Sequence, residues 1–115
     1  MRVHHLAFRT DDLGALERFY GSVVGLSVVR RNEKSIWLEA EGTIVMLERR
    51  GAREPKVDST SLELVAFSVA PGTGAALEAK LKTAGCMIES RTPYTLYVRD
   101  PDGRRVGLSS YPEAL

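Results

Sequence analysis

Apolar and polar residues alternate over residues 2–9, and the same alternation returns over residues 62–69. Both segments are rich in Val, Leu and Phe, which is typical of a half-buried strand. The two segments also match in sequence, because residues 5–10 (HLAFRT) are echoed 59 positions later by residues 64–69 (LVAFSV). The pattern therefore predicts an internal duplication in which each half opens with a strand.

Apolar residues at helical spacing follow each of these strands. In the first half, residues 10–12 (TDD) supply capping oxygens and negative charge for the first turn, and Gly25 ends the helix. In the second half, Thr73 is the predicted N-cap and Gly85 the predicted end. The predicted inward faces are Leu13, Leu16, Tyr20 and Val23 or Val24 in the first helix, and Ala76, Leu77, Lys80 and Leu81 in the second.

Three further strands are predicted after each helix. Residues 100–103 (DPDG) form a strong hairpin turn because Pro presets the bend and Gly takes a positive φ, and residues 39–42 (EAEG) are its degenerate copy. Residues 51–61 are polar and show no periodicity, so they are predicted to link the halves. The predicted strands are residues 26–31, 35–40 and 43–49 in the first half, and 86–91, 94–99 and 104–110 in the second.

The length of 115 residues is that of one ordinary domain. We therefore predict a single domain over residues 1–115 whose two halves share one core. The first βαβββ module covers about residues 1–50, the linker 51–61, and the second module about residues 62–115. The predicted fold class is α+β, with the two modules forming a curved mixed sheet around a pocket.

Composition and charge argue against some classes of partner and location. Hydrophobic residues make up 43% of the chain and charged residues 27%, which is typical of a protein that folds without a partner. The net charge of +1 offers no field to attract nucleic acid or an anionic membrane, so neither is expected as a partner. No apolar run approaches the ~20 residues needed to span a bilayer, and the N-terminal residues do not have the pattern of a secretory signal, so a cytoplasmic location is expected.

A helix can cover only one face of each four-stranded sheet, and the other face is the candidate site. Strand alternation places Leu6 and Phe8 against the helix, and His5, Ala7 and Arg9 on the opposite face. By the same alternation, Trp37 is assigned the register of Val98 and is predicted to point away from the pocket. The other residues predicted to face the pocket are Val3, Ile44, Met46, Glu48, Leu64, Ala66, Ser68, Arg105, Gly107 and Ser109.

The duplicated unit, its opening residues 5–8 (HLAF), the Gly that ends each helix and the turn at residues 100–103 resemble the vicinal oxygen chelate superfamily over nearly the whole chain. That superfamily includes glyoxalase I, extradiol dioxygenases, fosfomycin resistance enzymes and bleomycin resistance proteins. The resemblance implies a glyoxalase-like fold and a homodimer. It also implies that the enzymes hold a divalent metal through one ligand on the first strand and one on the last strand of each module.

Carried onto this chain, the four metal-ligand positions are His5, Met46, Leu64 and Gly107. Only His5 offers a suitable donor, because a Met thioether favours Cu(I) over Zn, Mn, Fe or Ni. We therefore expect no metal cofactor, and whether the chain is an enzyme stays uncertain, leaning against. The resulting prediction is a metal-independent protein of the glyoxalase/bleomycin resistance type that sequesters a small, partly apolar molecule.

Two alternatives stay open. The first is a lyase, isomerase or dioxygenase with a reduced site in which His5 and Glu48 hold Zn, Mn, Ni or Fe, and the second is a degenerate interaction module that binds no ligand. Arg9 matches an arginine that holds a substrate carboxylate in glyoxalase I enzymes, or it forms an ion pair with Glu48 or Asp11. Tyr97 matches a pocket tyrosine of the fosfomycin enzymes, or it fills the inner sheet surface. The candidate ligand-binding residues are His5, Arg9, Met46, Glu48, Leu64, Thr95, Tyr97 and Arg99.

Overall fold

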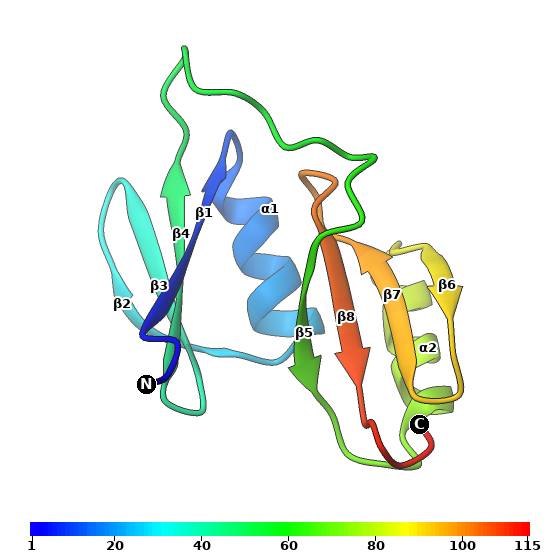
Figure 1. Ribbon diagram of the computed structural model, residues 1–115. Helices are drawn as coiled ribbons and strands as arrows, with labels where there is room; N and C mark the ends of the chain where they lie inside the picture. Colours follow the sequence, from blue (N-terminus) through cyan, green and yellow to red (C-terminus); the bar gives the residue numbers. More distant parts are fainter. The chain divides into compact units, whose positions relative to one another are not determined.

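Each half of the chain folds into a strand, a helical segment and three more strands, in the order that the duplication predicts (Figure 1). The computed structural model describes residues 1–115. The first half contains β1 (His5–Thr10), α1 (Leu13–Glu17), the π-helical η1 (Arg18–Val23), β2 (Ser27–Arg31), β3 (Ser35–Ala40) and β4 (Thr43–Arg49). The second contains β5 (Leu64–Ser68), α2 (Gly74–Thr83), β6 (Ile88–Arg91), β7 (Thr95–Arg99) and β8 (Arg105–Ser109).

The strands form two four-stranded sheets with the same topology, β1-β4-β3-β2 and β5-β8-β7-β6. In each sheet the first strand of the half runs parallel to the last, and the other neighbours are antiparallel. The connection between the two parallel strands runs through the helical segment and a hairpin of two antiparallel strands. The predicted α+β fold built from two βαβββ modules is thus confirmed. The chain divides into two units, Met1–Lys56 and Val57–Leu115.

The first helix begins as its sequence predicts. The Asp12 side chain accepts a hydrogen bond from the Ala15 amide at 3.0 Å, and Gly25 follows the helix with a φ of +94°. The helix departs from prediction after Glu17, where the Val24 amide donates to the Phe19 carbonyl in the wider π pattern. Both Phe19 and its neighbour Tyr20 are buried in this segment.

The prediction that the Thr73 side chain caps the second helix is wrong. Thr73 stands at the N-cap position of α2, but its hydroxyl donates to the Ala70 carbonyl at 2.6 Å and does not cap the helix. The backbone at Thr73 has a φ of −102° and a ψ of 5°, which is not the extended conformation that a capping side chain needs. Gly85 ends the helix with a φ of +76°, as expected.

None of the helices combines the length and the apolar composition that a membrane-spanning helix requires.

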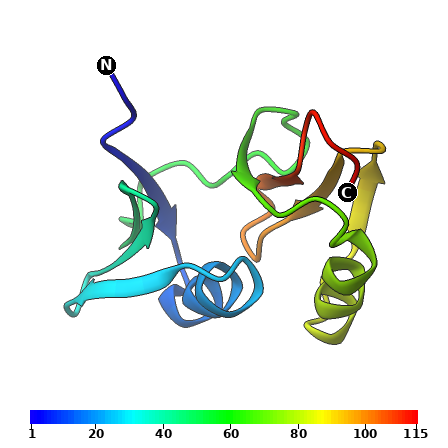
Figure 2. The same cartoon turned by 90° about the horizontal axis from the view of Figure 1, so that it is seen from below.

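Each unit has its own set of buried apolar residues between its sheet and its helix. Phe8 contacts the Tyr20 ring in the first unit, with 5.4 Å between ring centroids, and α2 lies against one face of the second sheet (Figure 2). The buried apolar residues are Leu13, Leu16, Phe19, Tyr20, Val23, Ile36, Leu38, Val45 and Leu47 in the first unit, and Leu81, Leu96, Val98, Val106 and Leu108 in the second.

The two hairpin turns differ as their sequences predict. In the second unit, Asp100 is buried and accepts from the Asp102 and Arg104 amides at 2.9 and 3.0 Å, and Gly103 has a φ of +90°. In the first unit, Glu41 and Gly42 both take positive φ values, 44° and 92°, so the shorter turn forces a non-glycine residue into the left-handed region.

An ion pair ties the edge strand β2 to the first helix. Arg31 donates to the Glu17 carboxylate, and this hydrogen bond holds the pKa of Glu17 below its usual 4.5. A folded pKa below the unfolded one stabilises the protein above the unfolded value, and the gain is lost as the pH falls through the folded value. We expect wild type to lose up to about 1 kcal/mol more than Glu17→Gln between about pH 6 and about pH 3. Urea unfolding at both pH values would measure this, and equal losses would contradict it.

Candidate functional site

The side chains that point away from α1 form three rows across the first sheet. We call this surface the first helix-free face. Because paired residues on adjacent strands share a face, the register defines the rows. The middle row is Ala7, Met46, Trp37 and Arg30, and the outer rows are His5, Ile44 and Glu39 at one end and Arg9, Glu48 and Ser35 at the other.

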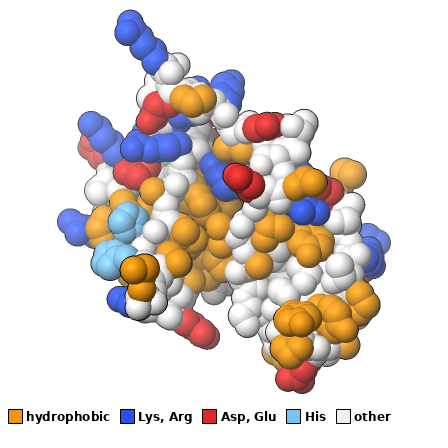
Figure 3. All heavy atoms as spheres, viewed as in Figure 1, with side chains coloured by type: hydrophobic (Ala, Val, Ile, Leu, Met, Phe, Trp, Pro, Cys, Tyr) orange, Lys and Arg blue, Asp and Glu red, His pale blue; other side chains and the backbone are white.

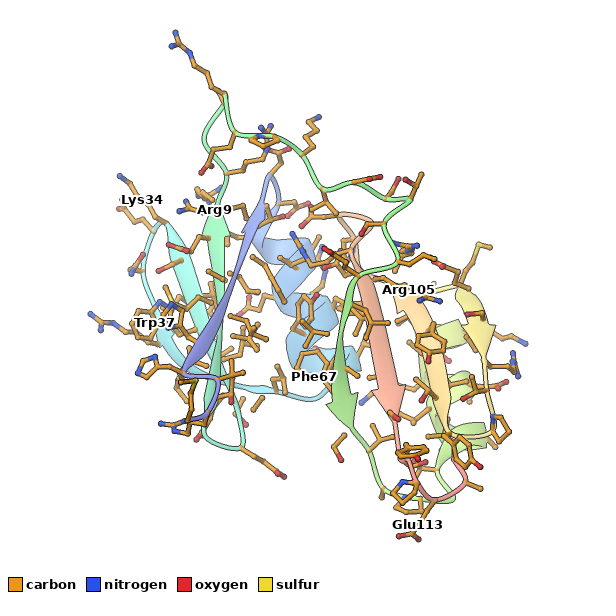
Figure 4. All side chains as sticks on the ribbon, viewed as in Figure 1. Arg9, Lys34, Trp37, Phe67, Arg105 and Glu113 are labelled. Carbon is orange, nitrogen blue, oxygen red and sulfur yellow. The ribbon has the colours of Figure 1, made fainter.

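Trp37 lies on the opposite face of the sheet from the one predicted. It was predicted to point away from the pocket, but it pairs with Met46, so it lies on the helix-free face with the candidate ligand-binding residues. Figure 4 shows Trp37 on the side of the sheet away from α1. The Arg30 guanidinium lies over its ring, 5.1 Å from the centroid. The error has a simple origin: one of the two extra residues of the second half lies in the turn at residues 100–104, after β7, so Trp37 matches Tyr97 and not Val98.

His5 is exposed on this face, and its ring contacts its neighbour in the chain. The Nδ1 atoms of His4 and His5 lie 2.9 Å apart, and the two histidines are at the surface in Figure 3. The cross-strand partner of His5 is Ile44, whereas Glu48 pairs with Arg9, four residues farther along. At about 3.3 Å per residue this separates them by ~13 Å, so the first unit does not bring His5 and Glu48 together as a pair of metal ligands.

Arg9 lies at the far end of the face and forms ion pairs. Its Nε is 3.9 Å from the Glu48 carboxylate and 3.8 Å from that of Glu54, and about half of its side chain is exposed. Of the two ion-pair partners considered from sequence, Glu48 is present. Asp11 instead accepts hydrogen bonds from Arg50. The Arg9 guanidinium therefore reaches solvent beside two carboxylates.

The second sheet has an equivalent surface, the second helix-free face. Its middle row is nearly flat beside an aromatic ring, because Gly107 has no side chain and Ala66 has only a methyl group. A Cβ at Gly107 would lie 3.2 Å from the Cβ of Ala66. The middle row is Ala66, Gly107, Tyr97 and Ser90, and the outer rows are Leu64, Arg105 and Arg99 at one end and Ser68, Ser109 and Thr95 at the other. The Thr95 hydroxyl is hydrogen-bonded to the Ser109 hydroxyl at 2.8 Å.

Two arginines on the second face converge on one carboxylate. Glu89 occupies the β-bulge of β6, where it accepts from Arg99 and lies 3.3 Å from Arg105 Nε. These arginines lower the pKa of Glu89. Arg99 also donates to the carbonyls of Ser61 and Gly103, so most of its donors hold the fold together. The Arg105 guanidinium lies over the Tyr97 ring, 4.4 Å from the centroid.

A shallow cavity of about 430 Å³ opens beside this end of the second face. Leu64 and Arg105 belong to both the cavity and the face. The rest of its lining is Val57, Asp58, Ser61, Glu63, Val65 and Arg104. Residues 57–61, predicted as part of the linker, thus lie against the second unit.

Sequence reasoning overlooked part of each face. Arg30 and Glu89 were not singled out, whereas Arg105 was predicted on the correct face but was not among the candidate ligand-binding residues. The signal was present in the repeat, because an offset of 60 positions aligns Trp37 with Tyr97 and Arg30 with Ser90. Both edge strands carry their bulge at the same repeat position, which alternation alone does not reveal.

The donor set of the two faces does not suit a metal. No group of three or more His, Cys, Asp or Glu side chains in the chain could hold a metal ion. Three of the four metal-ligand positions predicted from the resemblance are Met46, Leu64 and Gly107, which lack nitrogen or oxygen side-chain donors.

Comparisons with known proteins agree with the fold. A family model described as Glyoxalase/Bleomycin resistance protein/Dioxygenase superfamily matches residues 2–108. No curated protein matches the chain in sequence. Among solved structures, a glyoxalase/dioxygenase from Nostoc punctiforme is 21% identical, with a TM-score of 0.77 over 93% of this chain and 88% of its own.

Two further structures of proteins with different functions share the fold. The trypanothione-dependent glyoxalase I of Leishmania major is 22% identical, with a TM-score of 0.78 over 95% of this chain and 86% of its own. The fosfomycin resistance protein FosX of Mesorhizobium loti is 15% identical, with a TM-score of 0.79 over 95% of this chain and 90% of its own. At such identities the likeness concerns the fold alone.

Proposed function

Because the chain belongs to the glyoxalase/bleomycin resistance protein/dioxygenase superfamily, we propose that it binds a small, partly apolar molecule without a metal, as a homodimer. The observation that carries the proposal is the replacement of metal donors. Met46, Leu64 and Gly107 occupy three of the four ligand positions, and His5 alone cannot hold a hard or borderline cation. The two helix-free faces therefore remain available for a ligand, but they lack the side chains that would hold a metal ion for Lewis-acid chemistry.

The residues on these faces support binding of an apolar body. Met46 is half-buried beside Trp37, and its flexible thioether adapts to irregular surfaces. Leu64 is 37% exposed and leans over Gly107. Tyr97 is half-buried beside Gly107, and a flat group that displaces the Arg105 guanidinium could stack on its ring.

Polar groups at the ends of the faces would orient the ligand. Arg9 has an exposed guanidinium that can exchange a long ion pair for a ligand acceptor, and exposed His5 can donate or accept. Glu48 holds the Arg9 guanidinium in place through their ion pair. Arg99 in turn holds the Glu89 carboxylate at the end of the second helix-free face. Thr95 is buried and bonded to Ser109, so we assign it the support of the sheet beneath Tyr97.

Metal analysis and thermal shift together test this function. We expect purified protein to contain no stoichiometric Zn, Mn, Ni or Fe, and these ions to leave its Tm unchanged. In a compound screen, apolar ring compounds should raise Tm, because a ligand that prefers the native state stabilises by about 2.7 kcal/mol at a hundredfold excess over Kd.

The control is Met46→Glu, which restores an oxygen donor beside His5 on the same face. It should gain metal-dependent stabilisation that wild type does not show. One metal ion per wild-type chain that raises Tm would overturn the proposal, and so would a screen of apolar and polar compounds in which nothing shifts Tm.

A further inference from the structure

Two buried side-chain nitrogen atoms in the chain have no hydrogen-bond partner, and both belong to the aromatic–arginine pairs of the helix-free faces. They are Trp37 Nε1 and Arg105 Nε. Arg105 Nε lies 3.3 Å from the Glu89 carboxylate, so its charge is compensated. Trp37 Nε1 carries no charge and has no hydrogen-bond acceptor in the chain. A buried donor without an acceptor is unfavourable and rare, which indicates that an acceptor from outside the chain completes this one.

Arg30 is the second group without a polar partner at this place. Its guanidinium is exposed, lies over the Trp37 ring and makes neither an ion pair nor a hydrogen bond. The next residue, Arg31, points to the other side of β2 and is paired with Glu17. Arg30 is therefore the uncompensated cation of the middle row, beside an uncompensated indole N–H.

The rest of the middle row is apolar. Ala7 is exposed and small, and half-buried Met46 lies between Ala7 and Trp37 in the cross-strand register. A ligand across this row would place an apolar body on Ala7 and Met46 and its acceptor atoms toward Trp37 and Arg30. Two donors, one of them charged, favour an anionic acceptor over a neutral one.

We propose that the first helix-free face binds an apolar ring compound that bears a carboxylate. One carboxylate oxygen accepts from Trp37 Nε1 and the other pairs with the Arg30 guanidinium, which moves off the indole ring as the ligand enters. This inference rests on the proposed function and adds the chemical class of the ligand.

The chain contains a single tryptophan, so its fluorescence reports on this site alone. The probes are 4-butylbenzoate and 4-butylbenzamide, which have the same shape but differ in charge. We expect the benzoate to change Trp37 emission and to bind about tenfold more tightly than the benzamide, the difference given by about one charge-assisted hydrogen bond. Added salt should weaken the benzoate and leave the benzamide unaffected.

Arg30→Gln should reduce benzoate affinity about tenfold and leave benzamide affinity unchanged. Arg31→Gln is the matched control, since it removes the neighbouring arginine from the opposite side of the same strand and should leave both affinities at wild-type values. Trp37→Phe, measured by calorimetry, should also weaken benzoate binding.

Equal affinities for benzoate and benzamide, or benzoate binding that Arg30→Gln does not change, would overturn the inference. If other compounds then still raise Tm, the proposed function stands and only the carboxylate assignment fails. If neither the two probes nor any compound of the wider screen shifts Tm, the proposed function itself fails.

Discussion

Asp100→Ala is expected to destabilise the second unit by about 3–5 kcal/mol. The Asp100 carboxylate is fully buried, accepts from two backbone amides and pairs with Arg104 at 2.6 Å. Alanine would leave both amides without that acceptor and Arg104 without its buried partner. Urea unfolding of the variant and wild type, followed by circular dichroism, measures the difference in free energy of unfolding.

Two further variants separate the causes. Asp100→Asn keeps one acceptor oxygen for the turn but removes the charge, so it should recover part of the loss. Asp102→Ala changes a second carboxylate of the same turn that lies 3.4 Å from Arg104 and is partly exposed, so it should cost about 1 kcal/mol or less. A cost for Asp100→Ala as small as that for Asp102→Ala would show that the buried carboxylate does not hold the turn.

This turn also shows why so much of the fold was predictable. Its chemistry is local, because the Asp100 acceptor, the Pro101 bend and the positive φ of Gly103 lie within four residues. The same holds for the Asp12 cap and for Gly25 and Gly85, which end the helices. Since the repeat presents most of these signals twice, each half supported the interpretation of the other.

Features set by partners distant in the sequence were not predictable in the same way. The face on which Trp37 lies depends on its register with Met46, and a shift of one residue moves a side chain to the other face. The bulge in β6 turns Glu89 toward Arg99 and Arg105, and strand alternation contains no sign of it. The lack of an acceptor for the buried indole N–H of Trp37 depends on the positions of residues from several strands, which the sequence alone does not fix.

Leu47→Ala and Leu108→Ala form a matched pair, and each is expected to cost about 2–5 kcal/mol. Leu47 and Leu108 occupy equivalent positions on β4 and β8, and both are buried, at 0% and 1% exposure. Each is flanked by a phenylalanine on the parallel strand and an apolar residue on the antiparallel one. Truncation leaves a cavity that packed neighbours cannot fill, so urea unfolding should detect both losses.

Hydrogen exchange of the Leu47→Ala and Leu108→Ala variants tests the prediction, made from the chain length, that the two halves share one core. Because the buried residues divide between two units, we expect Leu47→Ala to reduce amide protection in β1, β3 and β4, and Leu108→Ala to reduce it in β5, β7 and β8. Equal loss in both halves of either variant would mean that the units unfold as one cooperative structure. A ligand on the first helix-free face would then stabilise both units equally against unfolding. If the units unfold independently, the ligand stabilises only the first unit.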